Sequence, residues 1–233
     1  MAVSPAPSQT KVRPLGRAVT SVSRNGVRGT AQRLHRWVIT PLWRRIHLRE
    51  EHVWFTVPFW PEGAPMPEGY VMRRGGMDDL QALAAIGSVS PEVGQRYLDR
   101  GARLYVAYHG DDLAFATWIH TGTVPVLAAR GGELRLPDGM ISFEDSIAAP
   151  AHRRGTISGA VIREVTAREQ RTGAEAIITR VAVENRAARK WALRMGSTPV
   201  ATVRLRRTLG WQRVDVESLP GGEAVAELLS ERL

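Results

Sequence analysis

The chain has 233 residues, no cysteine and a formal net charge of +9. The whole excess lies in residues 1–50, which hold ten basic side chains and one acid, whereas residues 51–233 hold 22 of each. The lack of cysteine excludes disulfide scaffolds, zinc–thiolate sites and thiol nucleophiles. No window approaches 18 continuous apolar residues, so no transmembrane helix is expected. The charge asymmetry predicts a neutral globular body with a cationic N-terminal arm.

Residues 1–29 are rich in Ser, Pro, Gly and Arg and poor in large apolar groups. Such a segment buries too little surface to offset its ordering entropy, so we expect a disordered basic tail. The same composition is typical of organellar transit peptides. The excess of Arg over Lys, 30 to two, runs through the whole chain, however, and indicates a coding bias. No apolar segment like that of a secretory signal begins the sequence.

Residues 30–68 predict an amphipathic helical and aromatic extension ending in a linker. Residues 30–51 read as two short basic helices, the second opening at Thr40-Pro41, because Thr is a good N-cap and Pro suits the first helical position. Residues 53–60 are apolar and strand-like, and residues 61–68 have linker composition. Six of the 15 aromatic side chains lie within residues 37–60. This region is therefore expected to dock on a surface: most simply its own body, otherwise a partner, a lipid surface or an acyl chain.

The body alternates strands and helices, recognised by apolar periodicity, capping residues and turn signals. The expected elements are a strand at 69–74, helices at 77–86 and 90–101, a hairpin of 103–109 with 113–120, a strand at 140–149, a helix at 155–172, a strand at 174–183, a helix at 185–195, a hairpin of 198–206 with 211–216, and a short helix or tail within 218–233. This order predicts an α/β (α+β) fold over 69–217: a mixed, mostly antiparallel sheet with a central right-handed β-α-β unit.

The segment 141–165 is the most informative, because a strand leads through a loop of Pro, Arg and Gly into a helix. The first N–H groups of a helix have no partners and carry partial positive charge. Small residues there let a ligand approach the backbone, and two arginines add charge. We therefore predict an anion cradle suited to a pyrophosphate, made of Arg153, Arg154, Gly155, Thr156, Ile157, Ser158 and Gly159.

Two motifs in the right order then resemble the GNAT superfamily of N-acetyltransferases over roughly 69–217. The family's pyrophosphate loop, V-x-P-x-x-R-G-x-G-x-G, is matched at Pro150, Arg153 and Ile157. Its later N-x-x-A-x-x-x-Y-x-x-x-G-F pattern is matched at Asn185, Ala188 and Gly196, and Phe143-Glu144-Asp145 resembles its L-E-D run. The sequence departs from the family where Thr156 and Ser158 replace glycines and Ala192 replaces the Tyr that usually acts as general acid.

The resemblance implies acetyl-CoA, a longer acyl-CoA or the phosphopantetheine of an acyl carrier protein as co-substrate, without a metal. The thioester would lie between the strands at 141–149 and 176–183, its amides pairing near Ile147 and Ala148, with Asn185 in the binding set. Glu144 is the first candidate for the base that deprotonates the acceptor amine, and Asp145 the second. Since neighbours on a strand point to opposite faces, only one is expected to face the site. His120 and His152 are weaker candidates.

The expected function is transfer of an acetyl or longer acyl group to an amine of a small molecule or peptide. The alternative is a catalytically reduced GNAT-fold binding module, whose cationic arm holds an acidic carrier protein, a membrane or nucleic acid. Nucleic acid is disfavoured because residues 1–29 lack interleaved aromatic side chains. Peripheral membrane contact through 30–60 and a homodimer stay open. A bacterial cytoplasmic protein, free or membrane-associated, is expected, with residues 121–139 as its main specificity loop.

Overall fold

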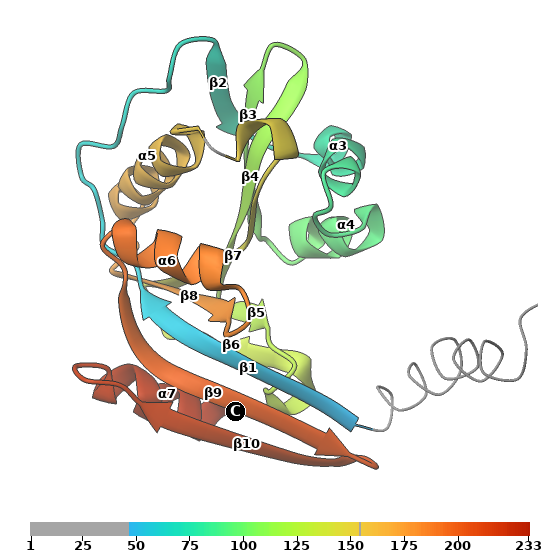
Figure 1. The fold of residues 1–233 in the computed structure, drawn as a ribbon, viewed down its shortest axis with the longest axis vertical. Coiled ribbons are helices and arrows are strands. Elements are labelled where there is room, and N and C mark those ends of the chain that lie inside the picture. Colours follow the sequence, from blue (N-terminus) through green and yellow to red (C-terminus); the bar gives the residue numbers. More distant parts are fainter. Residues whose placement is uncertain (1–46, 154) are drawn as a thin grey trace, which may run out of the picture. The chain divides into compact units, whose positions relative to one another are not determined.

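The computed structural model describes residues 47–153 and 155–233; the tail predicted at 1–29 and the helices predicted within 30–46 lie outside them. An eight-stranded sheet dominates this part of the chain, in the order β10-β9-β1-β8-β7-β4-β3-β2 (Figure 1). Its strands are β1 (His47–Thr56), β2 (Tyr70–Arg74), β3 (Arg103–His109), β4 (Asp112–Thr121), β7 (Met140–Ala148), β8 (Ala176–Ala182), β9 (Thr198–Thr208) and β10 (Trp211–Ser218). The mixed, mostly antiparallel sheet is the predicted fold class.

The described helices are α3 (Leu80–Ala85), α4 (Pro91–Asp99), α5 (Ile157–Arg171), α6 (Arg186–Arg194) and α7 (Glu223–Arg232). Short 3-10 turns are η2 (Met77–Asp79), η3 (Arg130–Gly132) and η4 (Pro150–His152). The predicted helix at 77–86 is thus η2 followed by α3, and the predicted terminal helix is α7. Within the described ranges, no helix combines the length and hydropathy required to span a bilayer.

Two apolar clusters cover opposite faces of the sheet. On one face, Ile157, Val161 and Val165 from α5 pack against alternate side chains of β4, β7 and β8. On the other, Leu80 and Leu83 from α3 pack with residues of β3 and β4. Figure 1 draws α5 on one side of β4 and β7, and α3 with α4 on the other. Each fully buried aliphatic side chain contributes about 1.5–3 kcal/mol, so both layers hold β7 in place.

The helix predicted to end near residue 51 is wrong for residues 47–51, which lie in strand β1. Strand β1 pairs antiparallel with β8, from His52 opposite Ala182 to Thr56 opposite Ile178. Pairing inside the sheet, with Trp54 and Phe55 almost fully buried, outweighs the local helical preference of a basic segment. A strand upstream of the predicted domain start at 69 therefore belongs to the same sheet.

The aromatic residues that follow β1 pack on the body of the protein. Val57 is buried in the cluster beneath α5, and Phe59 and Trp60 pack against that cluster. The Arg163 guanidinium lies 5.8 Å from the centre of the Trp60 ring. The described part of the aromatic segment, residues 53–60, therefore docks on its own fold.

The expected loop at 121–139 contains a small second sheet of β5 (Thr123–Pro125) and β6 (Glu133–Arg135). Val124 and Leu134, which pair across it, are fully buried. Strands of three residues are too short for apolar alternation to identify them. Their burial shows that this segment is anchored rather than a free loop.

Candidate functional site

Strands β7 and β8 run parallel and are paired over only four residues of each. The pairs begin at Met140 with Ala176 and end at Phe143 with Thr179. Beyond them, β7 continues beside β4, and β8 continues beside β1. This is the predicted central β-α-β unit, with α5 as its connection, and its two strands part in their second halves. Backbone groups of residues 144–148 therefore border an opening inside the sheet.

A bulge in β7 lies at this opening. The pairing of β4 with β7 shifts register between Ala116 and Trp118, which leaves Asp145 and Ser146 opposite the single residue Thr117. The Ser146 and Thr117 hydroxyls are 2.7 Å apart. Asp145 has φ of 49°, in the left-handed region that costs most non-glycine residues about 1–2 kcal/mol. Such positions cluster at functional sites.

The bulge corrects the expectation that Glu144 and Asp145 point to opposite faces. Regular alternation requires a regular strand, and the bulge interrupts it. The positive charge of Arg180, on β8, acts on both carboxyls. Both candidate bases therefore lie in the field of one guanidinium.

Glu144 is buried, and both of its oxygens have partners. The Ser142 hydroxyl donates to Oε1 at 2.8 Å, and Arg180 Nε donates to Oε2 at 3.1 Å. Arg180 also donates from Nη2 to the Pro125 carbonyl oxygen at 2.6 Å. Burial raises the pKa of Glu144, while Arg180 and the Ser142 hydrogen bond act in the opposite direction. The carboxyl is thus clamped between β7, β8 and the β5–β6 segment.

Asp145 differs from Glu144 in being partly open to solvent, whereas Glu144 is buried. Desolvation raises the pKa of its carboxyl, whereas the charge of Arg180 and the Tyr97 hydroxyl lower it. A carboxylate with a raised pKa is a better proton acceptor near neutral pH. Of the two predicted bases, Asp145 is therefore the one whose side chain is accessible to solvent.

Two rows of side chains cross the sheet on the face that carries Glu144. Strand pairing, together with the side-chain contact of Arg180 with Glu144, aligns Trp54, Arg180, Glu144 and Trp118 in one row. Strand pairing alone aligns Thr56, Ile178, Ser142 and His120 in the next. Three buried polar atoms in these rows, all among the described residues, have no hydrogen-bond partner: the indole nitrogens of Trp54 and Trp118, and His120 Nε2. Unpaired buried polar atoms are rare and often mark a place for water or a ligand.

Tyr97 from α4 covers these rows. Its ring makes edge contacts with Trp118 at 5.2 Å and with His120 at 4.8 Å between ring centres. Burial and the charge of Arg180 lower the pKa of His120 to about 4, so its ring is neutral at pH 7. Burial, together with the charges of Asp145 and Glu144, raises the pKa of Tyr97 to about 12. Tyr97 is consequently a hydrogen-bond donor here rather than an acid.

A cavity of about 10 Å³ adjoins His120. That volume holds about one water molecule. Its walls come from three segments, α4, the end of β4 and the β5–β6 hairpin, and comprise Tyr97, Arg100, His120, Thr123, Pro125 and Glu133. The predicted specificity segment thus closes over the same face as the candidate bases.

The predicted anion cradle begins at α5, just past the end of β7. Thr156 is the N-cap residue, and its side chain makes no capping hydrogen bond. The first N–H groups of α5, at Ile157, Ser158 and Gly159, precede the first intrahelical bond, from Ala160 N–H to the Thr156 carbonyl oxygen. Gly155 and Thr156 are exposed. These open donors fit a phosphate, so the geometry of this turn is compatible with the predicted anion cradle.

Of the two arginines of the predicted cradle, Arg153 belongs to the described residues. Arg153 is exposed and donates from Nε to the Ala148 carbonyl oxygen at 3.2 Å. It therefore occupies a backbone acceptor that was predicted to pair with pantetheine. Arg154 lies outside the described residues. Ile147, beside Ala148, is half-buried.

Helix α6 carries the second motif. Asn185 is exposed and accepts a hydrogen bond from Ala188 N–H at 3.1 Å, so it is a helix cap. Ala192, at the position of the family's tyrosine, is buried and offers no acid. Trp191 packs against the core cluster under α5. The two motifs therefore differ. The N–H groups at the start of α5 stay open, whereas the start of α6 is capped by the Asn185 side chain.

His152 lies in a ring cluster at the cradle's edge. The Tyr70 hydroxyl is 2.8 Å from His152 Nδ1, and the His109 ring lies 4.8 Å from the Tyr70 ring. His152 is thus a loop-anchoring group. Throughout the described ranges, no three His, Asp or Glu side chains gather into a group that could hold a metal ion.

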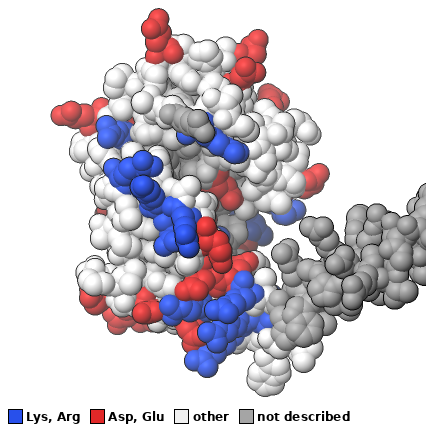
Figure 2. Space-filling view, in the orientation of Figure 1, with Lys and Arg blue, Asp and Glu red and all other residues white. Residues whose placement is uncertain are grey.

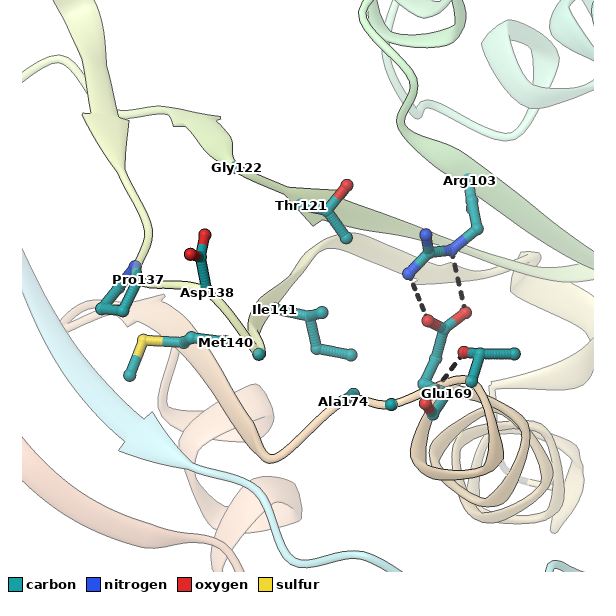
Figure 3. A pocket seen from close by; sticks show the side chains of 12 residues that line it. Arg103, Thr121, Gly122, Pro137, Asp138, Met140, Ile141, Glu169 and Ala174 are labelled. Carbon is teal, nitrogen blue, oxygen red and sulfur yellow. Dashed lines mark hydrogen bonds and ion pairs between the residues drawn. The ribbon is translucent and has the colours of Figure 1, made fainter.

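A cavity of about 300 Å³ lies elsewhere (Figure 3). It adjoins the first residues of β7 and the last turn of α5, whereas the cradle follows the end of β7. Glu169 in its wall accepts hydrogen bonds from Arg103 and from the Tyr105 hydroxyl. None of the predicted site residues lines it.

Sequence reasoning missed Ser142, Tyr97 and Arg180. Arg180 carried a signal, because it interrupts the apolar run Ile177-Ile-Thr-Arg-Val181 of a central strand. A charged side chain there needs a buried partner or a solvent-filled opening. Ser142 and Tyr97 carried none, because both fit ordinary strand and helix positions.

No family model matches the chain, and no curated protein matches it. Among solved structures, an acetyltransferase of the GNAT family from Novosphingobium aromaticivorans aligns with a TM-score of 0.51 and 13% identity, over 73% of this chain and 66% of that one. A Drosophila protein aligns with a TM-score of 0.51 and 12% identity, over 76% and 58%. The Bacillus subtilis acetyltransferase in complex with CoA aligns at 0.43 and 14%, over 55% and 75%. This chain covers less than two thirds of the length of each of the first two proteins. The chain therefore has the fold seen in GNAT acetyltransferases.

Proposed function

We propose that the protein is an N-acyltransferase that moves an acetyl or longer acyl group from a CoA or carrier-protein thioester to an amine. One observation carries the proposal: β7 and β8 part after Phe143 and Thr179, beside the open N-terminus of α5. A parted sheet offers backbone groups to a linear amide chain, and a helix N-terminus offers N–H groups to its phosphates. The shared fold supports the same class of reaction.

The donor is assigned to the α5 side of the opening. Residues 155–159 would hold the pyrophosphate through backbone N–H groups and the Thr156 and Ser158 hydroxyls. Arg153 would add charge. Backbone groups around Ile147 would pair with the pantetheine amides, and when bound the thioester supplies an activated acyl carbonyl. Asn185 is proposed to support this side by capping α6 rather than by contacting the donor.

The acceptor is assigned to the side that carries Tyr97 and the two carboxyls. Asp145 takes the ammonium proton, because its carboxyl is exposed and desolvation raises its pKa. The free amine nitrogen attacks the thioester carbonyl carbon, an amide bond forms as the C–S bond breaks, and the second proton of the nitrogen passes to the departed thiolate. Glu144, held by Ser142 and Arg180, keeps the bulge in position. The thiolate leaves without a tyrosine, since thiolates are stable near neutral pH.

The first test measures binding of acetyl-CoA and longer acyl-CoAs by titration calorimetry, with thiol release monitored over a panel of primary amines and peptides. We expect binding and amine-dependent thiol release. Failure of every thioester to bind would remove the proposal.

A sharper test removes the N–H and hydroxyl donors of one cradle residue while leaving the charge of the cradle unchanged. Ser158→Pro deletes a donor at the second residue of α5, and Ala224→Pro makes the same change at the second residue of α7. A hydrogen bond to a charged group contributes about 1.5–3 kcal/mol, so Ser158→Pro should weaken acyl-CoA binding roughly tenfold to a hundredfold. Equal affinity in both variants would contradict the cradle.

Buried Ala192, where the family has its acid, favours a second candidate: a binding module that has lost catalysis. It predicts acyl-CoA binding without amine-dependent thiol release across the whole panel. Thiol release that Asp145→Asn abolishes would exclude it.

A further inference from the structure

Helix α6 presents a line of unpaired positive charge. Arg186, Lys190 and Arg194 are exposed and spaced four residues apart, so they lie along one face of the helix. By helix geometry the line is about 12 Å long. In Figure 2 a diagonal band of blue side chains crosses the region where Figure 1 draws α6. We call these three residues the α6 stripe.

The α6 stripe works against the stability of its own helix. Within residues 47–153 and 155–233, none of its side chains takes part in an ion pair or a hydrogen bond. Like charges four residues apart repel each other, and a cation at Arg186 is unfavourable at the positive end of the helix dipole. By contrast, Arg168 on α5 pairs with Glu164 one turn away. The stripe therefore lacks the compensation found on a neighbouring helix.

The α6 stripe ends beside the proposed donor site. Helix α6 begins directly after β8, one of the two parting strands. At its other end, Met195 lies against the first turn of α5, since a Cβ placed on Gly159 would be 3.5 Å from the Met195 sulfur. A partner lying along the stripe would thus be next to both the cradle and the opening between β7 and β8.

The shape of the patch favours a protein over a nucleic acid. Leu193, beside the stripe, is 53% exposed and offers an apolar contact. A straight line of three cations matches carboxylates with the same spacing on a helix, because both repeat at four residues.

We propose that the α6 stripe docks an acidic helix of a carrier protein, which delivers its phosphopantetheine thioester into the opening between β7 and β8. The proposal rests on the proposed function, because it names the source of the donor. The pantetheine arm and the cradle serve CoA and a carrier alike, whereas the stripe adds affinity only for the protein. Charge complementarity at a rim of this kind mainly accelerates association and sets specificity.

The experiment compares two double charge reversals of the full chain. Arg186→Glu/Lys190→Glu alters the stripe, and its new acids suit the first turns of a helix. Arg74→Glu/Arg206→Glu is the control, because both residues are exposed and the net charge changes equally. Binding of holo-acyl carrier protein is measured by calorimetry at low and physiological salt. We expect the stripe variant to bind about tenfold more weakly than wild type, the control to change less than twofold, and added salt to weaken wild-type binding.

Binding of acetyl-CoA separates this proposal from the proposed function. The stripe variant should bind acetyl-CoA within twofold of wild type, because the cradle is untouched. If acetyl-CoA binds wild type but the carrier does not, or if both variants bind the carrier equally, the docking proposal fails alone. If no thioester binds wild type, the proposed function fails. A short DNA duplex that loses affinity with the stripe variant, without any carrier binding, also overturns the proposal. A carrier whose acidic helix is reversed to Lys should regain affinity for the stripe variant.

Discussion

Two ion pairs, each of which joins a buried glutamate to an arginine of the sheet, have different surroundings. Glu169 on α5 is held by Arg103 (Figure 3) and also accepts a hydrogen bond from the Tyr105 hydroxyl. Glu144 on β7 is held by Arg180 and the Ser142 hydroxyl. The atoms that form each pair are similar, so the pairs differ by what lies beside them.

The Glu169 network is complete, whereas the Glu144 network adjoins groups that are not satisfied. His120 Nε2 and the Trp118 indole nitrogen lack partners, and Asp145 has a left-handed backbone. Yet the larger cavity lies beside Glu169. Cavity size therefore indicates where the fold leaves space, whereas unpaired polar atoms and backbone strain indicate where groups are available to bind a ligand or to react.

The largest expected effect breaks the complete network. Glu169→Ala leaves the Arg103 charge and the buried Tyr105 hydroxyl without their partner, so the free energy of unfolding should fall by about 3 kcal/mol. Chemical denaturation measures it. Asp215→Ala, which breaks the exposed pair with Arg213, is the control and should cost less than about 1 kcal/mol. Equal losses would mean that the Glu169 pair is no more than a surface ion pair.

The next effect is a pH dependence of the free energy of unfolding, and it comes from His120 beside the Glu144 network. The pKa of His120 falls from its usual value to about 4 on folding, so the unfolded chain binds more protons between those values. Stability should therefore be full above pH 6.5 and decline as the pH falls toward 4, by roughly 3 kcal/mol. His120→Gln should abolish that part of the decline, measured as the difference from wild type in denaturation at pH 4.5 and 7.5. Parallel pH profiles for the two proteins would refute it.

The third effect concerns turnover. Asp145→Asn keeps the size and backbone preference of the residue but removes the proton acceptor, so kcat should fall about a hundredfold. The affinity for acetyl-CoA should stay within twofold, because the cradle lies on another element. Glu144→Gln is the comparison and should lower stability through its weakened pair with Arg180. Full turnover in Asp145→Asn would move the role of base back to Glu144.

The smallest effect reports on the bulge itself. Asp145 has φ of 49°, which glycine adopts freely and alanine does not. Stability should decrease in the order Gly, Asp, Ala at this position, with a spread of about 1 kcal/mol. Thermal unfolding of Asp145→Gly and Asp145→Ala checks the order. A glycine variant less stable than wild type would indicate that the Asp145 side chain contributes more than its backbone costs.

The sequence predicts the alternation of elements well, because caps and apolar periods are local signals. Ser90 as the cap of α4 and Asn185 as the cap of α6 are examples, and both hydrogen bonds are present. The sequence indicates only the apolar end of β1, from residue 53, because the basic residues before it form a strand only when neighbouring strands are there to pair with them.

The candidate site shows the same division between local features, which the sequence predicts, and features that depend on distant residues, which it does not. The cradle is predicted because its residues are consecutive. The bulge at Asp145 is not, since an extra residue in a strand is visible only against its partner strand. The association of Glu144 with Arg180 joins residues 36 positions apart, and only the charge of Arg180 in an apolar strand hints at it.

The place of β1 also has a consequence for how the chain folds. His52 pairs with Ala182, about 130 positions later, and β1 lies between β8 and β9 in the sheet. Contacts between such distant positions close large loops and slow folding. Until β8 has been synthesised, β1 has no neighbour, and both of its edges can pair with other chains. A ribosome-bound intermediate of this protein should therefore be most prone to aggregation before residue 182 emerges.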